Sequence, residues 1–245
     1  MLAIIGGSGL TQLSSLENVR REVARTPYGE PSGALTFGSL HGREVIFLAR
    51  HGYGHTIPPH RVNYRANLWA LKTAGAECIV SVASVGGIRP DCTPGALVVP
   101  DQILDYTWGR ASTFSDGIDA LVRHVDFTHP YDENIRRRIL SAAREVGEAV
   151  IDGGVYATTQ GPRLETSAEI DRFERDGADV IGMTGMPEAV LARELELPYA
   201  AINVVVNYAA GREASMQGIH LEGIEQVLQE AMLRVRKVLA RLCQS

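Results

Sequence analysis

Short apolar runs that stop abruptly recur in the first half of the chain. Residues 2–5 run into the glycine turn GGSG, and residues 78–85, rich in β-branched side chains, run into a glycine pair. Residues 44–49 end instead at Arg50 and His51. Such runs are typical of buried strands, and glycine marks the turns that follow them. The pattern predicts a sheet with several loops meeting along one rim, where ligands gather in α/β folds.

Further strand and helix patterns fill the rest of the chain. Strands are expected at residues 34–37, 97–99, 150–158, 179–183 and 199–206, and helices at residues 63–74, 132–146, 187–195 and 220–242, with another helix capped by Thr166. The first of these strands forms a hairpin with residues 44–49. No repeat, linker or low-complexity stretch divides these elements. We therefore expect a single α/β domain over residues 1–245, with a mixed, largely buried central β-sheet flanked by helices.

The composition narrows the class of protein. The chain of 245 residues is 45% hydrophobic and 22% charged, as in ordinary soluble globular proteins. Its net charge of −5 gives no general attraction to nucleic acid or to an anionic membrane. The chain has three cysteines without a CxxC pair, no signal peptide, and no apolar run of about 18 residues. These features favour a soluble protein of the reducing cytoplasm.

The segment at residues 48–64, LARHGYGHTIPPHRVNY, is dense in arginine and histidine. Its glycines and prolines suit neither a strand nor a helix, which indicates a loop. A guanidinium pairs bidentately with phosphate, so we expect this loop to bind a compact anion. A solvated polar loop without a ligand is the alternative. A metal site is a weaker one, because no helix aligns the three histidines and no carboxylate or thiolate adjoins them.

The GGSG turn can also bring backbone N–H groups against an anion, with Ser8 adding a hydroxyl. A dinucleotide fingerprint would need glycine at position 12, where Gln12 stands, and the GK[ST] ending of a P-loop is absent. A tight turn without a ligand is an equally open interpretation. The failed fingerprint argues against a nicotinamide-dependent dehydrogenase, and a non-catalytic nucleotide-binding protein is the other rival.

Two further segments carry weaker signals. Residues 107–130 lack clear periodicity and are long for a connection, which predicts a lid or an oligomer contact. The solvent-exposed face of the helix at residues 132–146 is expected to carry Arg136, Arg137 and Arg138. The net negative charge of the chain and the absence of aromatic residues between these arginines argue against a nucleic-acid site there.

Five segments stand in an order that is highly specific. They are GGSGL at residues 6–10, ARHGYGHTIPPHRVNYRAN at 49–67, SVGGIRP at 84–90, QGPRLET at 160–166 and GMTGMPEAVLARE at 182–194. With them the chain resembles, over nearly its whole length, the trimeric purine nucleoside phosphorylases, and most closely their methylthioadenosine phosphorylase branch. The resemblance implies a phosphorylase-like fold with a partly barrel-like sheet, and a homotrimer with sites at subunit interfaces. It implies phosphorolysis, in which inorganic phosphate displaces the purine, without a metal or another cofactor.

The resemblance also implies roles for single residues. It assigns phosphate binding to Ser8, Arg50, His51 and Thr184, with backbone amides near Ala83 and Ser84, and ribose packing to Met183. This chain has Ala83 where relatives often carry a phosphate-binding threonine. One hydroxyl is therefore missing, and we expect weaker phosphate affinity or a greater reliance on the amides.

The base pocket departs from the methylthioadenosine branch, which places two aspartates where this chain has Asn207 and Ala209. Glu165 matches the glutamate of phosphorylases specific for 6-oxopurines. An ionised Glu165 accepts from the N1–H of hypoxanthine or guanine, and Asn207 donates to O6 or accepts from a protonated N7. Adenine would set its N1 lone pair against the carboxylate, a mismatch of about 1–3 kcal/mol. Glu165 and Asn207 are thus the candidate catalytic pair; the alternative is that Glu165 caps the helix near Thr166.

The 5′ end of the sugar gives the last expectation. Phosphorylases of ordinary nucleosides present a histidine there, whereas the matching stretch GIHLEGI places Leu221, flanked by Ile219 and Ile224. This apolar lining suits a methylthio group. His220 adjoins Leu221, so a register shift of one would reverse the conclusion. His124 matches a residue that relatives lend across the trimer interface.

These expectations combine into one reaction, in which phosphate and S-methyl-5′-thioinosine give hypoxanthine and S-methyl-5-thioribose 1-phosphate. S-methyl-5′-thioadenosine is the first alternative substrate, followed by inosine or guanosine.

Overall fold

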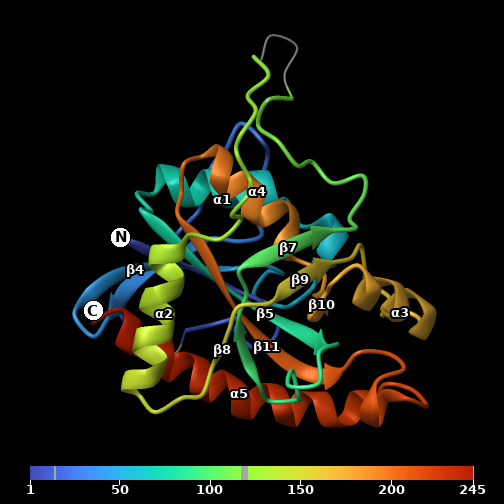
Figure 1. Ribbon diagram of the computed structural model, residues 1–245. Coiled ribbons are helices and arrows are strands. Elements are labelled where there is room, and N and C mark those ends of the chain that lie inside the picture. The colour runs from blue at the N-terminus through green and yellow to red at the C-terminus, as the bar shows by residue number, and fades with distance from the viewer. Residues whose placement is uncertain (14, 117–120, 245) are drawn as a thin grey trace.

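The structure is a computed structural model that describes residues 1–13, 15–116 and 121–244 (Figure 1). Its strands are β1 (Leu2–Gly6), β2 (Glu17–Glu22), β3 (Leu35–Leu40), β4 (Arg43–Ala49), β5 (Cys78–Gly87), β6 (Leu97–Val99), β7 (Gln102–Asp105), β8 (Ile151–Asp152), β9 (Val155–Thr158), β10 (Val180–Gly182) and β11 (Tyr199–Tyr208). Its helices are α1 (Tyr64–Thr73), α2 (Glu133–Glu145), α3 (Ser167–Arg175), α4 (Gly185–Glu194) and α5 (Leu221–Leu242), with short 3₁₀ turns at Pro59–Arg61 and Glu213–Ser215.

The strands join one mixed sheet that forks at β5. One path runs β2-β3-β4-β1-β5-β10-β9-β7, and a second arm leaves β5 through β11 to β6 and β8. The first part of β5 pairs with β1 and its end pairs with β10, while β11 follows it along most of its length. This forked, mixed sheet with flanking helices confirms the predicted fold class.

The loops that carry the predicted site meet at one edge of this sheet. β1 runs parallel to β4 and to β5, and β11 runs parallel to β5, so their carboxyl ends point the same way. β10 runs antiparallel to the end of β5, which brings the segment after β10 toward that edge. The predicted rim of strand ends is therefore present.

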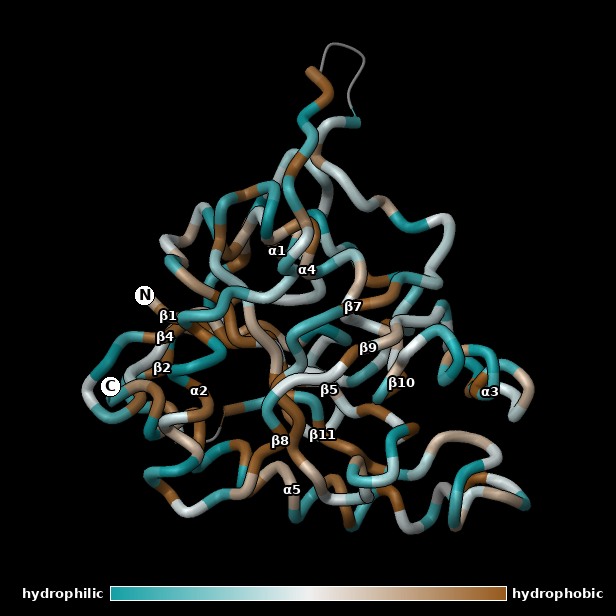
Figure 2. Tube along the Cα trace, viewed as in Figure 1, coloured by the Kyte–Doolittle hydropathy of each residue, from teal (hydrophilic) through white to brown (hydrophobic). Residues whose placement is uncertain are grey.

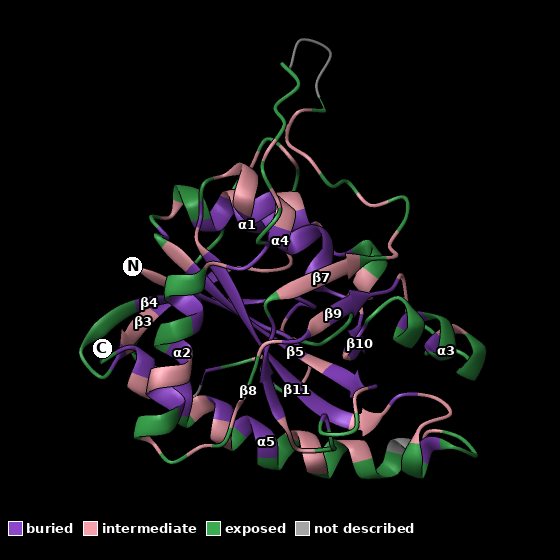
Figure 3. Cartoon of the chain, in the orientation of Figure 1, coloured by how far each residue is buried: buried purple, intermediate pink, exposed green. Residues whose placement is uncertain are grey.

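Helices cover both faces of the sheet. Side chains of α2 and α5 share one core with β1, β5 and β11, and side chains of α1 and α4 share a second core with residues of β3, β4 and β5. Figure 2 shows apolar residues concentrated along the central strands, and Figure 3 shows the same strands buried. α3, by contrast, is largely exposed (Figure 3).

Local sequence explains several element ends. His41 and Gly42 have φ values of 51° and 81°, and two consecutive left-handed residues make the tight turn that fits a β-hairpin. The predicted hairpin of β3 and β4 is confirmed by their antiparallel pairing. Asp132 caps α2 by accepting from the Ile135 backbone N–H, and Thr166 caps α3 as predicted.

The sequence analysis did not predict two of the strands, β2 and β7. All six residues of β2 are exposed, so the stretch ENVRRE shows no alternation between apolar and polar side chains. β7 is only four residues long and none of its residues is fully buried. Pairing with β3 and β9, rather than their own pattern, defines these strands.

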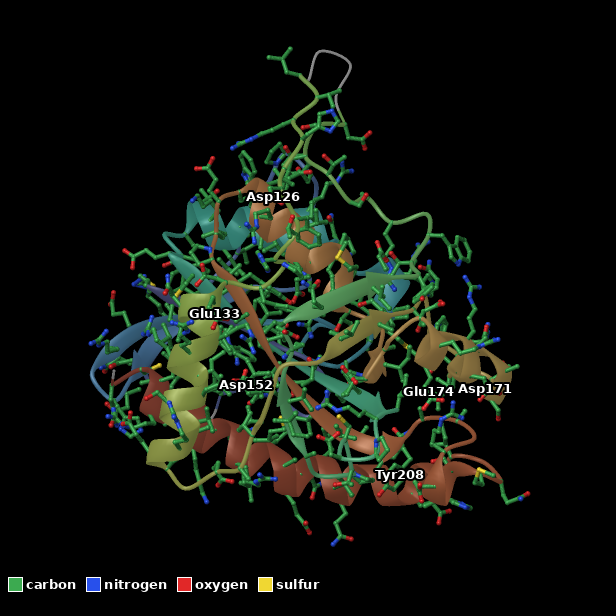
Figure 4. The ribbon with its side chains drawn as sticks, viewed as in Figure 1. Asp126, Glu133, Asp152, Asp171, Glu174 and Tyr208 are labelled. Carbon is green, nitrogen blue, oxygen red and sulfur yellow. The ribbon has the colours of Figure 1, made fainter. Side chains whose placement is uncertain are left out.

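The prediction that Arg136 lies on the solvent-exposed face of α2 was wrong. Its guanidinium is buried and pairs with Glu133 at 2.6 Å and with Asp152 of β8 at 2.5 Å, two acids labelled in Figure 4. Its Nε also donates to the Pro100 carbonyl. Arg136 therefore joins α2 to the sheet, while Arg137 and Arg138 are exposed as predicted.

The described parts of residues 107–130 contain no helix or strand and extend above α1 and α4 in Figure 1. Residues 117–120 lie outside the described residues. A lid or an oligomer contact remains the prediction for this segment. None of the described helices is both long enough and apolar enough to cross a membrane.

Candidate active site

A cavity of about 630 Å³ opens at the rim of strand ends. Most of the predicted site residues line it: Ser8, Arg50, His51, Ser84, Glu165, Met183, Thr184, Asn207, Ala209, Ile219 and Ile224. They come from strand ends, loops and the start of α5, which lie far apart in the sequence and meet in the fold. The volume is in the range of small-molecule sites.

The glycine turn forms one wall of this cavity. A Cβ on Gly6 would lie 2.0 Å from the Leu10 carbonyl oxygen, and one on Gly7 would lie 2.8 Å from Arg50 Nη1. Only glycine allows the turn to pack this closely, which places Ser8 at the cavity beside His55, with Oγ and Nε2 3.4 Å apart. His55 also lines the cavity and was not predicted individually.

Arg50 is fully buried and is held in place by Glu188, which is also fully buried. Its Nε and Nη2 donate to the two carboxylate oxygens at 2.7 and 2.8 Å, and Nη2 and Nη1 also donate to Ser81 Oγ and the Val82 carbonyl. Burial opposes the charge, but Glu188 outweighs it and raises the pKa of Arg50, so the guanidinium stays charged. Within the described residues these contacts leave one N–H of Nη1 for a ligand.

Glu188 is the functional residue that the sequence analysis missed most clearly. It accepts further hydrogen bonds from Ser81 Oγ and Tyr199 Oη, at 2.9 and 2.8 Å. A carboxylate inside the otherwise mostly apolar stretch GMPEAVLA was the available signal. Buried carboxylates need partners of opposite charge, so this position could have been paired with a buried arginine.

His51 is neutral near pH 7. Its Nδ1 lies 2.8 Å from the Ile57 carbonyl oxygen, which can only accept, so Nδ1 carries the hydrogen. Burial and the neighbouring Arg50 charge lower the pKa of His51 from 6.5 to about 4. The neutral ring therefore keeps Nε2 as a hydrogen-bond acceptor.

This lowered pKa predicts a loss of stability on acidification. Below pH 6.5 the unfolded chain protonates His51 while the folded chain does not, so stability falls between pH 6.5 and about 4. The full loss from this group is about 3 kcal/mol. Urea unfolding across this pH range should show a shallower dependence in His51→Gln, whereas His60→Gln, which changes an exposed ring, should match the parent. Equal slopes in all three proteins would contradict the assignment.

Glu165 also lines the cavity. Thr159 Oγ1 donates to its Oε1 at 2.6 Å. Burial raises the pKa of Glu165, and the hydrogen bond from Thr159 opposes that rise. The cap of α3 is made by Thr166 and Glu169 instead, which form a reciprocal capping box. The alternative role of Glu165 as the helix cap is therefore excluded.

Asn207, the last residue but one of β11, lines the same cavity as Glu165 and follows a register shift in the pairing with β5. Its Nδ2 donates to the carbonyl oxygen of Tyr208, which Figure 4 labels at the end of β11. Within the described residues, Oδ1 and the second N–H of the amide have no such partner. Ala209, 2% exposed, lines the same wall with a methyl group.

The remaining wall is apolar. Ile219 and Ile224 line it, and His220 is exposed and not among the lining residues, although it adjoins them in sequence. Leu221 begins α5, and its side chain lies outside what the structure describes. His124 is exposed in the protruding segment and does not line this cavity.

Arg110 ties two loops of the site together, and the sequence analysis did not find it. Nη1 donates to the carbonyls of Met183 and Met186, at 2.8 and 2.6 Å. Nη2 donates to the carbonyls of Thr159 and Gln160, at 3.1 and 2.9 Å. Arg110 lies in the aperiodic segment at residues 107–130, where no spacing pattern singles it out.

The lining of the cavity therefore combines a cationic group with hydroxyl groups, an acid with an amide, and apolar side chains. This arrangement suits a ligand that combines an anion, a polar heterocycle and an apolar substituent. Among the described residues no group of three or more histidine, cysteine, aspartate or glutamate side chains is placed to hold a metal ion.

Comparison with known proteins points to one family. The family model of the phosphorylase superfamily matches residues 1–244. A probable S-methyl-5′-thioinosine phosphorylase of Pseudomonas syringae is 55% identical over 98% of this chain and 97% of its own length. A 6-oxopurine nucleoside phosphorylase of Pyrococcus furiosus is 46% identical over 98% of this chain and 91% of its own. The structure of Schistosoma mansoni methylthioadenosine phosphorylase with adenine superimposes with a TM-score of 0.94, at 32% identity over 99% of this chain and 90% of that one.

Proposed function

Because this chain belongs to the phosphorylase superfamily, we propose that its cavity catalyses phosphorolysis of S-methyl-5′-thioinosine. The products are hypoxanthine and S-methyl-5-thioribose 1-phosphate. One observation supports hypoxanthine as the base: Glu165, Asn207 and Ala209 all line the cavity. Aspartates in place of Asn207 and Ala209 would instead suit adenine. The names of the two relatives above support this choice.

Phosphate binds beside the cationic group, Arg50. Ser8, Thr184, the free N–H of Arg50 and the backbone near Ser84 donate hydrogen bonds to it, and Met183 packs against the ribose. The neutral His51 accepts the O–H of hydrogen phosphate at Nε2. This contact fits an anion that still carries one proton.

The chemistry then needs stabilisation of the leaving base. A phosphate oxygen forms a new bond to C1′ while the C1′–N9 bond breaks. The electron pair of the C1′–N9 bond passes to the purine. Glu165 accepts from N1–H, and Asn207 either donates to O6 or accepts from a protonated N7. Both contacts orient hypoxanthine as it departs. Neither a metal nor a cofactor other than phosphate takes part in this proposal.

The apolar side chains select the sugar. Ile219 and Ile224 contact the methylthio group, where inosine would bury a hydroxyl without a partner, and the family resemblance assigns Leu221 to the same 5′ site. By the resemblance to trimeric phosphorylases, three copies of the chain assemble. Residues 1–245 of each copy form a single domain. His124 of one copy then reaches the 5′ side of the next. We place this assembly in the cytoplasm.

A comparison of substrates at saturating phosphate tests the proposal. S-methyl-5′-thioinosine should be cleaved with a kcat/KM about 10- to 100-fold above that of inosine, because one apolar group against one hydroxyl is worth about 1–3 kcal/mol. Hypoxanthine release should require phosphate. Equal use of inosine would refute the apolar 5′ site, and preference for S-methyl-5′-thioadenosine would refute the roles of Glu165 and Asn207. The second outcome would support the alternative activity, a methylthioadenosine phosphorylase.

A further inference from the structure

Thr159 directly follows β9, and its side chain hydrogen bonds to Glu165. Its side chain is 9% exposed and does not line the cavity. Its Oγ1 lies 2.6 Å from Glu165 Oε1 and 3.3 Å from the Gly182 carbonyl oxygen. A hydroxyl has one hydrogen, so it can serve only one of these two acceptors at a time. The shorter distance assigns that hydrogen to Glu165.

The charged groups around Glu165 are bound elsewhere. Arg163 pairs with both carboxylate oxygens of Glu169, at 2.6 and 2.8 Å, at the start of α3. Arg110 donates hydrogen bonds to backbone carbonyls, including those of Thr159 and Gln160 from Nη2.

The other elements packed against Glu165 bring no charge to it. The ends of β10 and β11 and the residues just after them line the cavity with side chains that do not titrate near neutral pH: Ile181, Gly182, Met183, Thr184, Val206, Asn207 and Ala209. Among the described residues, Thr159 therefore makes the side-chain hydrogen bond that favours the ionised form of Glu165, while the nearby charges of Arg163 and Glu169 favour and oppose that form, respectively.

We propose that Thr159 is a specificity-determining positioning residue, whose hydroxyl keeps Glu165 an ionised acceptor and leaves Oε2 for the purine. A carboxylate held in this way selects a base with N1–H. A protonated Glu165 would instead donate to the N1 lone pair of adenine. This inference rests on the proposed function and extends it, because it places the choice between oxo- and aminopurine in a residue outside the cavity.

Removal of the hydroxyl should have a defined effect. A hydrogen bond to a charged group corresponds to about a 10- to 100-fold effect on the equilibrium it supports. Thr159→Val should therefore lower kcat/KM for S-methyl-5′-thioinosine by about 10- to 100-fold near neutral pH. The acid limb of the pH profile of kcat/KM should move to higher pH in this variant, because Glu165 then ionises less readily. The ratio of S-methyl-5′-thioadenosine to S-methyl-5′-thioinosine cleavage should rise at the same time.

The neighbouring threonine supplies a matched control. Thr158 is fully buried, and its Oγ1 has no hydrogen-bond partner among the described residues. Thr158→Val makes the same isosteric change one residue away and should keep the parent pH profile and substrate ratio. Thr159→Ser, which retains the hydroxyl, should restore the profile that Thr159→Val loses.

A second background separates positioning from folding. In Glu165→Gln, which has no ionisable group, adding Thr159→Val should produce no further change in kcat/KM or in the pH profile. If Thr159→Val is poorly folded, Thr159→Ala in both backgrounds gives the same comparison. The inference is overturned if the hydroxyl-free variants keep the parent acid limb and substrate ratio. Failure of the proposed function looks different, because the parent itself would then leave S-methyl-5′-thioinosine uncleaved.

Discussion

Replacing Glu188 by glutamine is expected to destabilise the folded chain by about 3–5 kcal/mol, the usual cost of leaving one member of a buried ion pair without its partner. Glu188 receives hydrogen bonds from Arg50, Ser81 and Tyr199, all inside the core. A glutamine has no charge to offset Arg50, and its N–H group would oppose one of the guanidinium N–H groups. Phosphate-dependent activity should fall with stability, because a shifted Arg50 disturbs the glycine turn packed against Nη1.

Urea unfolding and the KM for phosphate measure these two effects. Glu196→Gln is a matched control, since Glu196 is an exposed acid just beyond the same helix and should leave the unfolding midpoint unchanged. A double replacement, Arg50→Met with Glu188→Leu, removes both charges. It should recover much of the stability, because apolar residues often replace a buried pair at little cost, but not the activity. A parent-like midpoint for Glu188→Gln would show that the pair does not stabilise the fold.

The sequence predicted the parts of the fold that have a pattern of their own. β1, β4, β5 and β11 are apolar runs of a length typical of strands, and their ends are marked by glycine or by polar residues. α5 shows a clear apolar stripe over its length. β2 could not be found in this way, because an exposed edge strand need not alternate and its pairing with β3 is a tertiary property.

The site was predictable where a residue lies at a strand end and meets the cavity directly. Ser8, His51 and Asn207 follow this rule. Residues that act through another side chain or through backbone carbonyls were missed, as Glu188, Thr159 and Arg110 show. Their partners lie 138, 6 and 73 positions away along the chain, for Arg50, Glu165 and Met183 respectively. Such pairings follow from the fold, so a single sequence does not reveal them.

The same reasoning explains why Arg136 was misplaced. Its position on α2 suits a polar face, and three arginines in a row suggest solvent. The short β8, with Asp152, passes close to that face and provides the partner that a helix pattern cannot predict. Arginine is the basic residue best suited to such a site, because its fork serves several acceptors at once.

The substitutions Asn207→Asp and Ala209→Asp together are expected to reverse the choice of base. A carboxylate at these positions accepts from the N6 amino group of adenine and from a protonated N7, and it repels the O6 acceptor of hypoxanthine. Each mismatch is worth about 1–3 kcal/mol, so the ratio of kcat/KM for S-methyl-5′-thioadenosine over S-methyl-5′-thioinosine should rise by about a thousandfold for the pair. Asn207→Asp alone should give part of the change.

Asn207 and Ala209 both line the cavity, so a carboxylate at either position would be close to a bound base. Ala209→Asn is the matched control, since it adds the same bulk without a charge and should change the ratio far less. Initial rates for both nucleosides at saturating phosphate give the ratio, and the unfolding midpoint reports the cost of the buried acid. A double variant with the parent ratio would mean that the purine edge lies elsewhere in the cavity. The specificity would then have to come from Glu165 alone, and loss of selectivity in Glu165→Gln would decide that case.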